Sequence, residues 1–320
     1  MSQLTTGRAV AERVYGVLLT GGRCAPRTLG LACLILLLWP LAMAAAQDAS
    51  GTGAEDAGEA AKTDAGPPPE GGDDLRAKAQ NPVANMISLP FENSLDFGAP
   101  DGSAYFLNIQ PVIPFTVGDW NFINRTIVPI IRAPGELAGL PGLPEGGSGS
   151  GSVWGLGDIN HTTFLSPAKP GPIIWGVGPS IQFPSATSSR LGTGKWAAGP
   201  SAVFITQPAP WSIALLVRQM WSFAAAKSDR DDVSQFVVQP FINYNLDDGW
   251  YLVTEPAFTA NWAASRGQRW TVPIGGGFGR LFKIGEQPIN IRLQGFKFVE
   301  KPDNAPDWVA KLSIALLFPK

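Results

Sequence analysis

The most regular alternation of apolar and polar residues in the chain is the run Phe236-Val237-Val238-Gln239-Pro240-Phe241-Ile242-Asn243-Tyr244. Most of its large apolar side chains fall on one face of an extended strand, and Gln239 and Asn243 fall on the other. Such a strand separates two different environments. Similar runs recur about a dozen times up to the C-terminus. This pattern predicts an all-β fold, an antiparallel up-and-down transmembrane β-barrel whose outside faces lipid and whose inside faces water.

The connections between these runs support a barrel of about twelve strands. We expect the strands at 83–93, 104–116, 120–131, 154–165, 172–183, 195–206, 211–224, 233–244, 250–262, 269–282, 288–299 and 307–318. Short turns alternate with longer connections, as periplasmic turns and external loops do in bacterial outer-membrane barrels. An even number of strands leaves both ends of the domain, 81–320, on the periplasmic side.

The composition favours a protein whose surface is not mainly in contact with water. Apolar residues make up 45% of the chain and charged residues only 16%, against about 25% in an average soluble domain. The formal net charge is -2, and no long basic run is present. A nucleic-acid partner is therefore not expected.

The first 46 residues have the organisation of an export signal. A basic stretch ends at Arg27, an apolar core follows at 29–43, and small residues at 44–46 offer a cleavage site. We therefore predict a signal peptide at 1–46, with an uncleaved membrane anchor as the alternative. Cys24 and Cys33 both lie in this segment, so the mature chain would contain no thiol.

Residues 47–80 form a segment of different composition. It is acidic, rich in Gly, Ala and Pro, and lacks aromatic residues. Such a segment buries too little apolar area to offset the entropy of ordering, so we predict a disordered leader. A plug or a partner-binding arm is the functional alternative.

Proline and glycine within the expected strands predict irregularities in the wall. The prolines in question are Pro111, Pro114, Pro129, Pro179, Pro240, Pro256 and Pro273. Proline removes a ladder donor, so we expect bulges or kinks at several of these sites. The glycines at 275–277 suggest a bend or a close approach to the backbone.

Setting the apolar faces toward lipid leaves a polar set that we expect to line the lumen. Its members are Gln110, Gln182, Arg218, Gln235, Gln239, Asn243, Glu255, Asn261, Asn290, Arg292, Gln294 and Lys311. The orientation of Arg125 and Asp158 is left open by the pattern. A charge on the lipid face at mid-bilayer costs about 2–4 kcal/mol, which favours inward orientation of the charged members. The set fits either a weakly selective polar conduit or an internal network that blocks passage.

The sequence gives little support to catalysis. The chain has one histidine, His161. Asp158, Asn160 and Thr162 share one strand face, which places His161 on the opposite, lipid-facing side. We therefore predict no enzymatic activity, no cofactor and no metal, with a lipid-modifying barrel enzyme as a third and lower-ranked alternative.

Several segments together resemble one family of outer-membrane transport barrels. They are Asn-Pro-Val-Ala at 81–84, Leu-Asn-Ile-Gln-Pro-Val-Ile-Pro-Phe at 107–115, Gly-Leu-Gly-Asp-Ile-Asn at 155–160, Phe-Leu-Ser-Pro-Ala-Lys-Pro-Gly at 164–171, Gly-Lys-Trp at 194–196, Gln-Pro-Phe-Ile-Asn-Tyr-Asn-Leu at 239–246 and Arg-Trp-Thr-Val-Pro-Ile-Gly-Gly-Gly at 269–277. This set is similar to the barrels of the phenol-degradation meta-pathway type, some of which carry the label "neuromedin U". The resemblance covers 81–320 and implies uptake of small, often aromatic, compounds. It brings no catalytic residues.

The sequence therefore predicts an outer-membrane channel or transporter for the passive passage of small solutes in a Gram-negative bacterium. The alternative is a non-conducting structural or interaction barrel. Expected partners are outer-membrane lipid, an unidentified small solute and the barrel-assembly machinery. The final strand ends in an aromatic residue, Phe318, as insertion signals of such proteins do, although Pro319 and Lys320 follow it.

Overall fold

The computed structural model describes residues 71–135, 140, 143, 151–226 and 230–319. The predicted signal peptide and residues 47–70 of the predicted leader lie outside the described residues. The elements are α3 (Gly71–Ala79), β1 (Ile87–Ala99), β2 (Gly102–Ile109), β3 (Val112–Val117), β4 (Trp120–Ala133), β5 (Val153–Leu156), β6 (Ile159–Pro167), β7 (Ile174–Phe183), β8 (Lys195–Thr206), β9 (Trp211–Ala225), β10 (Ser234–Asn245), β11 (Trp250–Thr254), β12 (Phe258–Asn261), β13 (Trp270–Ile284), β14 (Gln287–Glu300) and β15 (Trp308–Phe318).

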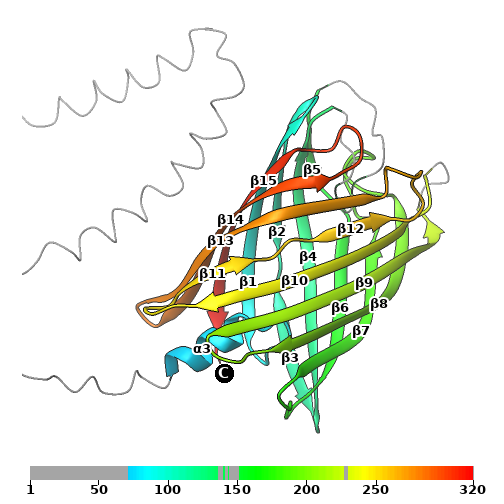
Figure 1. The fold of residues 1–320 in the computed structure, drawn as a ribbon. Helices are drawn as coiled ribbons and strands as arrows, with labels where there is room; N and C mark the ends of the chain where they lie inside the picture. Colours follow the sequence, from blue (N-terminus) through cyan, green and yellow to red (C-terminus); the bar gives the residue numbers. More distant parts are fainter. Residues whose placement is uncertain (1–70, 136–139, 141–142, 144–150, 227–229, 320) are drawn as a thin grey trace, which may run out of the picture. The chain divides into compact units, whose positions relative to one another are not determined.

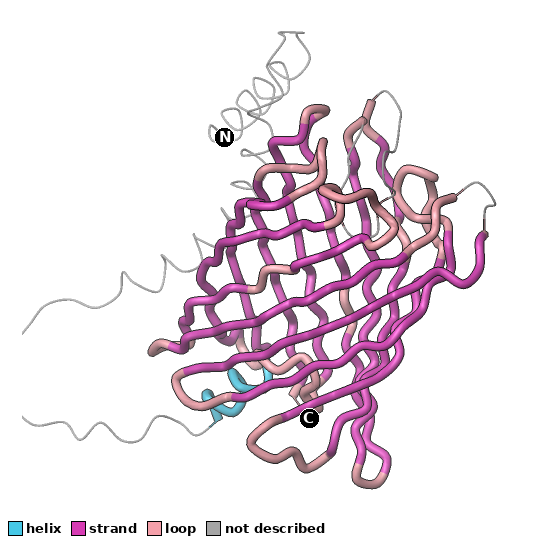
Figure 2. Tube along the Cα trace, turned by 45° about the vertical axis from the view of Figure 1, so that its right-hand side comes forward, coloured by secondary structure: helices cyan, strands magenta, loops and turns pink. Residues whose placement is uncertain are grey.

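The strands form one closed antiparallel barrel (Figures 1 and 2). Three wall strands are interrupted, so β2 continues as β3, β5 as β6, and β11 as β12. The fifteen segments therefore make twelve wall strands. Pairing of β9 with β10 and of β1 with β15 leaves no free edge. The predicted all-β, twelve-strand barrel is confirmed.

The first hairpin differs from the expected one. We expected a strand at 83–93 and a long connection at 94–103, but β1 runs from Ile87 to Ala99 and β2 begins at Gly102. The strand continues because Leu95 and Phe97 extend its outward apolar series. Residues 83–86 instead lie inside the barrel, where Val83 and Met86 are buried.

Only some of the prolines interrupt the wall. Breaks occur at Pro111, between β2 and β3, and at Pro256, between β11 and β12, and the register of β13 shifts at Pro273. Pro114, Pro129, Pro179 and Pro240 keep regular register partners. Breaks or register shifts are thus present at three of the predicted sites, and the other four prolines keep a register partner in one neighbouring strand.

The outer surface of the barrel is apolar. Leu252, Ile274 and Phe204 are about half exposed although they are large and apolar. Aromatic pairs lie near both ends of the strands, such as Trp211 with Tyr244 and Trp262 with Trp270. This arrangement suits a wall surrounded by lipid, with aromatic residues at the two interfaces. No described helix is long and apolar enough to cross a membrane.

The interior is filled near both ends. At the end with the short turns, Val83 packs with Ile123, Phe164 and Leu216. At the opposite end, Leu140 and Leu143 of the connection between β4 and β5 join an inner apolar cluster that includes Phe106, Phe296 and Val309. The polar interior lies between these two apolar regions.

Candidate functional site

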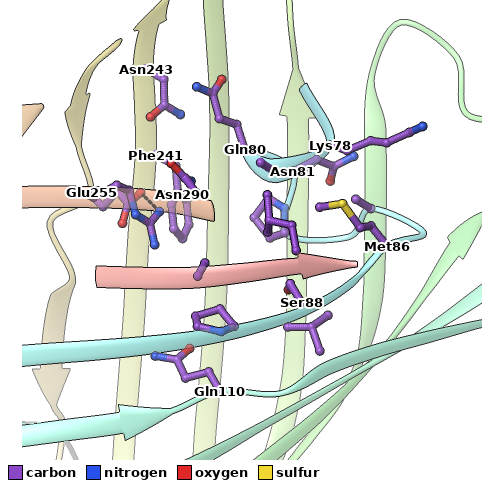
Figure 3. A pocket seen from close by; sticks show the side chains of 18 of the residues that line it. Lys78, Gln80, Asn81, Met86, Ser88, Gln110, Phe241, Asn243, Glu255 and Asn290 are labelled. Carbon is purple, nitrogen blue, oxygen red and sulfur yellow. Dashed lines mark hydrogen bonds and ion pairs between the residues drawn. The ribbon is translucent and has the colours of Figure 1, made fainter. Parts of the chain in front are cut away.

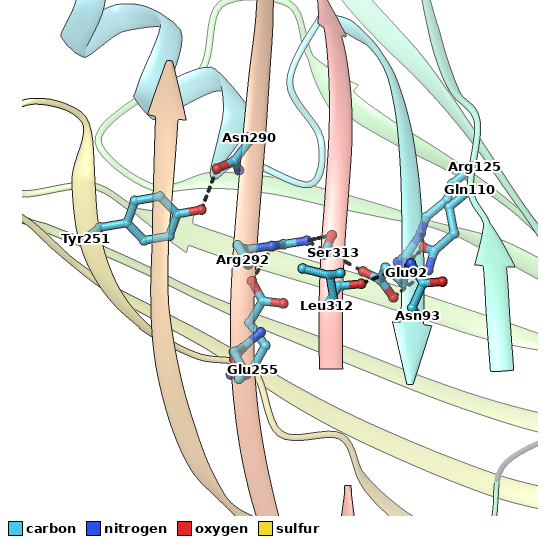
Figure 4. Close-up of polar contacts among 11 residues, drawn as sticks. Glu92, Asn93, Gln110, Arg125, Tyr251, Glu255, Asn290, Arg292, Leu312 and Ser313 are labelled. Atoms are coloured by element: carbon cyan, nitrogen blue, oxygen red, sulfur yellow. Dashed lines mark hydrogen bonds and ion pairs between the residues drawn. The ribbon is translucent and has the colours of Figure 1, made fainter. Parts of the chain in front are cut away.

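The polar centre of the barrel is a layer of charged side chains held by Arg292 of β14 (Figure 4). One guanidinium nitrogen of Arg292 donates to the Glu255 carboxylate. The other donates to Ser313 Oγ at 3.0 Å and lies 3.5 Å from the Glu92 carboxylate. Arg292 therefore engages both of these carboxylates.

The same layer extends across β1 to β4. Gln110 Nε2 donates to Glu92 at 2.6 Å. Arg125 Nη2 and Nε donate to Gln110 Oε1 at 2.6 and 3.2 Å. Contacts thus run continuously from Glu255 to Arg125 through the lumen. We call Glu92, Gln110, Arg125, Glu255 and Arg292 the charged layer.

Local backbone features position the Arg292–Glu255 pair. Glu255 lies in the break between β11 and β12, and its backbone N–H donates to Gln294 Oε1 at 3.1 Å. Gly279 is the register partner of Arg292, and a Cβ atom there would overlap the ring of Tyr251. The absence of a side chain at Gly279 leaves room for this ring, whose hydroxyl donates to Asn290 at 2.6 Å. A side chain at Gly279 would displace Tyr251 from beside the layer.

The segment from α3 to Met86 lies across the end of the barrel that carries the short turns. Arg76 donates to the Leu246 carbonyl at 2.7 Å and Gln80 to Asn245 at 2.8 Å, both at the β10–β11 turn. Gln207, from the β8–β9 turn, donates to the Ala77 carbonyl at 2.9 Å. We call residues 71–86 the plug segment. Its helix occupies the last part of the predicted leader, where the sequence led us to expect disorder.

Two cavities lie on either side of the charged layer. One, of about 100 Å³, lies against the plug segment, with Gln80, Asn243 and Asn290 in its wall (Figure 3). The other, of about 190 Å³, lies toward the long loops and combines apolar Phe106 and Phe298 with Lys311. Both are lined by Glu92. The charged layer therefore separates two chambers of one lumen.

The twelve residues expected to line the lumen lie on the inner face at several heights. Gln110, Asn243, Glu255, Asn290, Arg292 and Gln294 come together at or beside the charged layer. Lys311 lines the chamber that lies toward the long loops, which we call the outer chamber. Gln182 donates hydrogen bonds to Asp158 and Thr193 near the loop after β7. Gln235 and Asn261 are register partners, and Gln239 pairs with buried Leu216. Arg218 donates to Asn160 from another part of the wall.

Sequence reasoning missed Glu92 and Tyr251 and left Arg125 unassigned. A signal for Glu92 was present, because Ile87, Leu89 and Phe91 alternate with polar or small residues at 88, 90 and 92. The expected strand at 83–93 included this alternation, so Glu92 could have been assigned to the lumen from sequence. No comparable signal marks Arg125, since its layer contact is with Gln110, across a break between strands.

His161 lies on the outer face of the wall. Its ring nitrogens contact Thr126 Oγ1 at 3.0 Å and Thr163 Oγ1 at 3.1 Å. Asp158, Asn160 and Thr162 are buried on the inner side. Among the described residues, no group of His, Cys, Asp and Glu is arranged to hold a metal ion.

A closed antiparallel barrel with an apolar outer wall and charged interior defines a transmembrane β-barrel of the bacterial outer membrane. No protein family and no curated protein matches the sequence. Among solved structures, the chain is similar to an outer membrane channel from Pseudomonas putida F1, with a TM-score of 0.53, 14% identity, and coverage of 73% of this chain and 94% of that chain.

Two further solved structures are more distant. The NanC porin has a TM-score of 0.42 and 10% identity, covering 73% of this chain and 100% of that one. The CymD monoaromatic hydrocarbon channel has a TM-score of 0.35 and 12% identity, covering 76% and 93%. The likeness to the Pseudomonas putida channel supports the barrel fold. The phenol-degradation type stays a prediction.

Proposed function

We propose that this protein is a passive outer-membrane channel for small solutes and that the plug segment moves aside to open it. The observation that carries the proposal is the pair of chambers on either side of the charged layer, which share Glu92. Chambers at successive depths would give a solute places to reside on its way through the barrel. Energy coupling is not required, because the solute would move down its own gradient.

The outer chamber supports a preference for solutes with an apolar part. Phe106, Phe298 and Val309 provide apolar contact, while Lys311 provides charge and Asp96 a carboxyl group. A small amphipathic compound, with an aromatic ring among the candidates, fits this combination. At the charged layer, Arg292 and Glu255 would then interact electrostatically with a charged group of the passing solute.

A non-conducting interaction barrel is the second candidate. The filling of both ends, by Val83 and by Leu140 with Leu143, favours it. The residues expected to be removed on export, 1–46, play no part in either proposal, and N-terminal sequencing of the mature protein near Gln47 would test that expectation.

Liposome swelling with the purified protein separates the two candidates. We expect swelling in monosaccharides and single amino acids and none in trisaccharides, because a twelve-strand barrel is narrower than porins of 16–18 strands. Single-channel recording should show discrete openings. Liposomes that swell in no solute, together with bilayers that show no openings, would support the non-conducting barrel.

A further inference from the structure

The charges of the described interior are unevenly paired. Glu92 and Glu255 both engage Arg292. The two carboxylates also attract Arg125 electrostatically, which lies in the same layer. The carboxylates of the charged layer thus interact with two of the three arginines of the described interior, Arg292 and Arg125. The third of these arginines is Arg218 of β9.

Arg218 is a cation without a carboxylate partner among the described residues. Its Nη1 donates to Asn160 Oδ1 at 2.9 Å. Its Nε is buried and has no hydrogen-bond partner. Arg125 carries the same charge and repels it. A buried guanidinium group without a counter-ion destabilises the folded protein unless an anion binds to it.

The wall between the two arginines is lined by hydroxyl groups. Thr162 pairs in register with both Arg125 and Ser180, and Ser201 pairs with Arg218. The Ser180 hydroxyl contacts that of Thr162 at 2.5 Å and that of Ser201 at 2.7 Å. Three hydroxyl donors share two mutual hydrogen bonds, so one donor remains for another acceptor.

We propose that Arg218, flanked by Arg125 and this row of hydroxyls, binds the carboxylate of a permeating solute inside the barrel. The guanidinium fork offers the parallel N–H donors that a carboxylate accepts in pairs. Ser180 and Ser201 both carry small side chains. The inference rests on the proposed function, since it names the chemical class that the channel would favour.

Ligand-observed NMR on the purified full-length protein tests the site without requiring conduction. The probes are acetate and benzoate, each compared with its amide, which has the same shape and no charge. We expect the acids to bind about tenfold more tightly or better, as a charge-assisted hydrogen bond implies. Arg218→Gln should abolish this preference. Arg266→Gln removes the same charge from an exposed loop and should leave it unchanged.

A second variant keeps the test decisive if Arg218→Gln does not fold. Asn160→Asp places a carboxylate where Arg218 already donates, so it should fill the site from within. This variant should lose acetate binding and melt at a higher temperature than the wild type. Equal acetate affinity in the wild type and in Asn160→Asp, or equal affinity of the wild type for acids and amides, would overturn the proposal.

The binding test and the transport test can refute the two proposals separately. Carboxylate binding by a protein that supports no liposome swelling would refute the channel and leave the anion site standing. Swelling without any preference of the protein for acids would do the reverse.

Discussion

The pair formed by Glu255 and Arg292 lies in the charged layer between the two chambers. Glu255 is 8% exposed and Arg292 16% exposed, so water screens their attraction only partly. Because Arg292 also lies near Glu92, the removal of either partner changes both the balance of charge and the packing of the layer.

Neutralising Glu255 should therefore shift ion selectivity toward anions. Glu255→Gln leaves Arg292 with one carboxylate, and the reversal potential in a KCl gradient should move in the anion direction. Arg292→Gln should move it toward cations. Breaking such a buried pair costs about 3–5 kcal/mol. On denaturing gels of samples heated to increasing temperatures, the band of the folded barrel should therefore disappear at a lower temperature.

Glu286→Gln is the matched control for this pair of variants. It removes the same charge from an exposed short turn and should change neither quantity. Unchanged selectivity in Glu255→Gln and Arg292→Gln, with barrels that fold, would show that ions do not pass this layer.

At the scale of elements, the plug segment is held by polar contacts with the turns of the barrel and by apolar contacts in two clusters, one around Val83 and one around Met86. Val83 is 2% exposed and lies in a cluster contributed by the barrel wall. Neighbouring Asn85 is exposed and donates to Thr116. Substitutions at Val83 and Asn85 therefore distinguish the effect of undocking the segment from the effect of changing its charge.

A charge at Val83 should undock the plug segment. Val83→Asp gives up the burial of a valine, about 1.5–3 kcal/mol, and adds the cost of an unpaired charge. Open probability in single-channel recordings should rise by about tenfold or more. Asn85→Asp adds the same charge outside the cluster and should behave as the wild type. Equal open probabilities for all three proteins would contradict gating by this segment.

The wall strands could be predicted from sequence because their signal is local. An alternation over 236–244 identifies a strand and both of its faces without reference to the rest of the chain. The contacts of the site are not local. Arg292 and Glu255 are 37 positions apart, and Gln80 meets Asn245 across 165 positions. The helix α3 was missed because its few apolar residues, Leu75 among them, gain burial only against the inner wall.

For the whole molecule, closure depends on the last strand meeting the first. β15 pairs with β1 from Ile87–Phe318 to Phe97–Trp308. Phe318 is 41% exposed at the end of this ladder. Leu312 lies on the same outward face nearer the middle of the strand.

These positions allow closure to be separated from recognition during assembly. Phe318→Ala and Leu312→Ala both leave the ladder intact. If the terminal aromatic residue is read by the assembly machinery, Phe318→Ala should lower the yield of heat-modifiable barrel in outer membranes more than Leu312→Ala does. Equal yields would remove the case for a terminal signal and leave the barrel itself standing.

The plug segment runs directly into β1, and this continuity has a kinetic consequence. Once released, the segment cannot diffuse away, because Met86 joins the wall at Ile87. Short tethers of this kind give effective concentrations in the millimolar range. Reclosure is therefore a first-order event whose rate does not depend on how much protein the membrane holds. A free peptide with the sequence of residues 71–86 would have to approach millimolar concentration before it competed with the tethered copy.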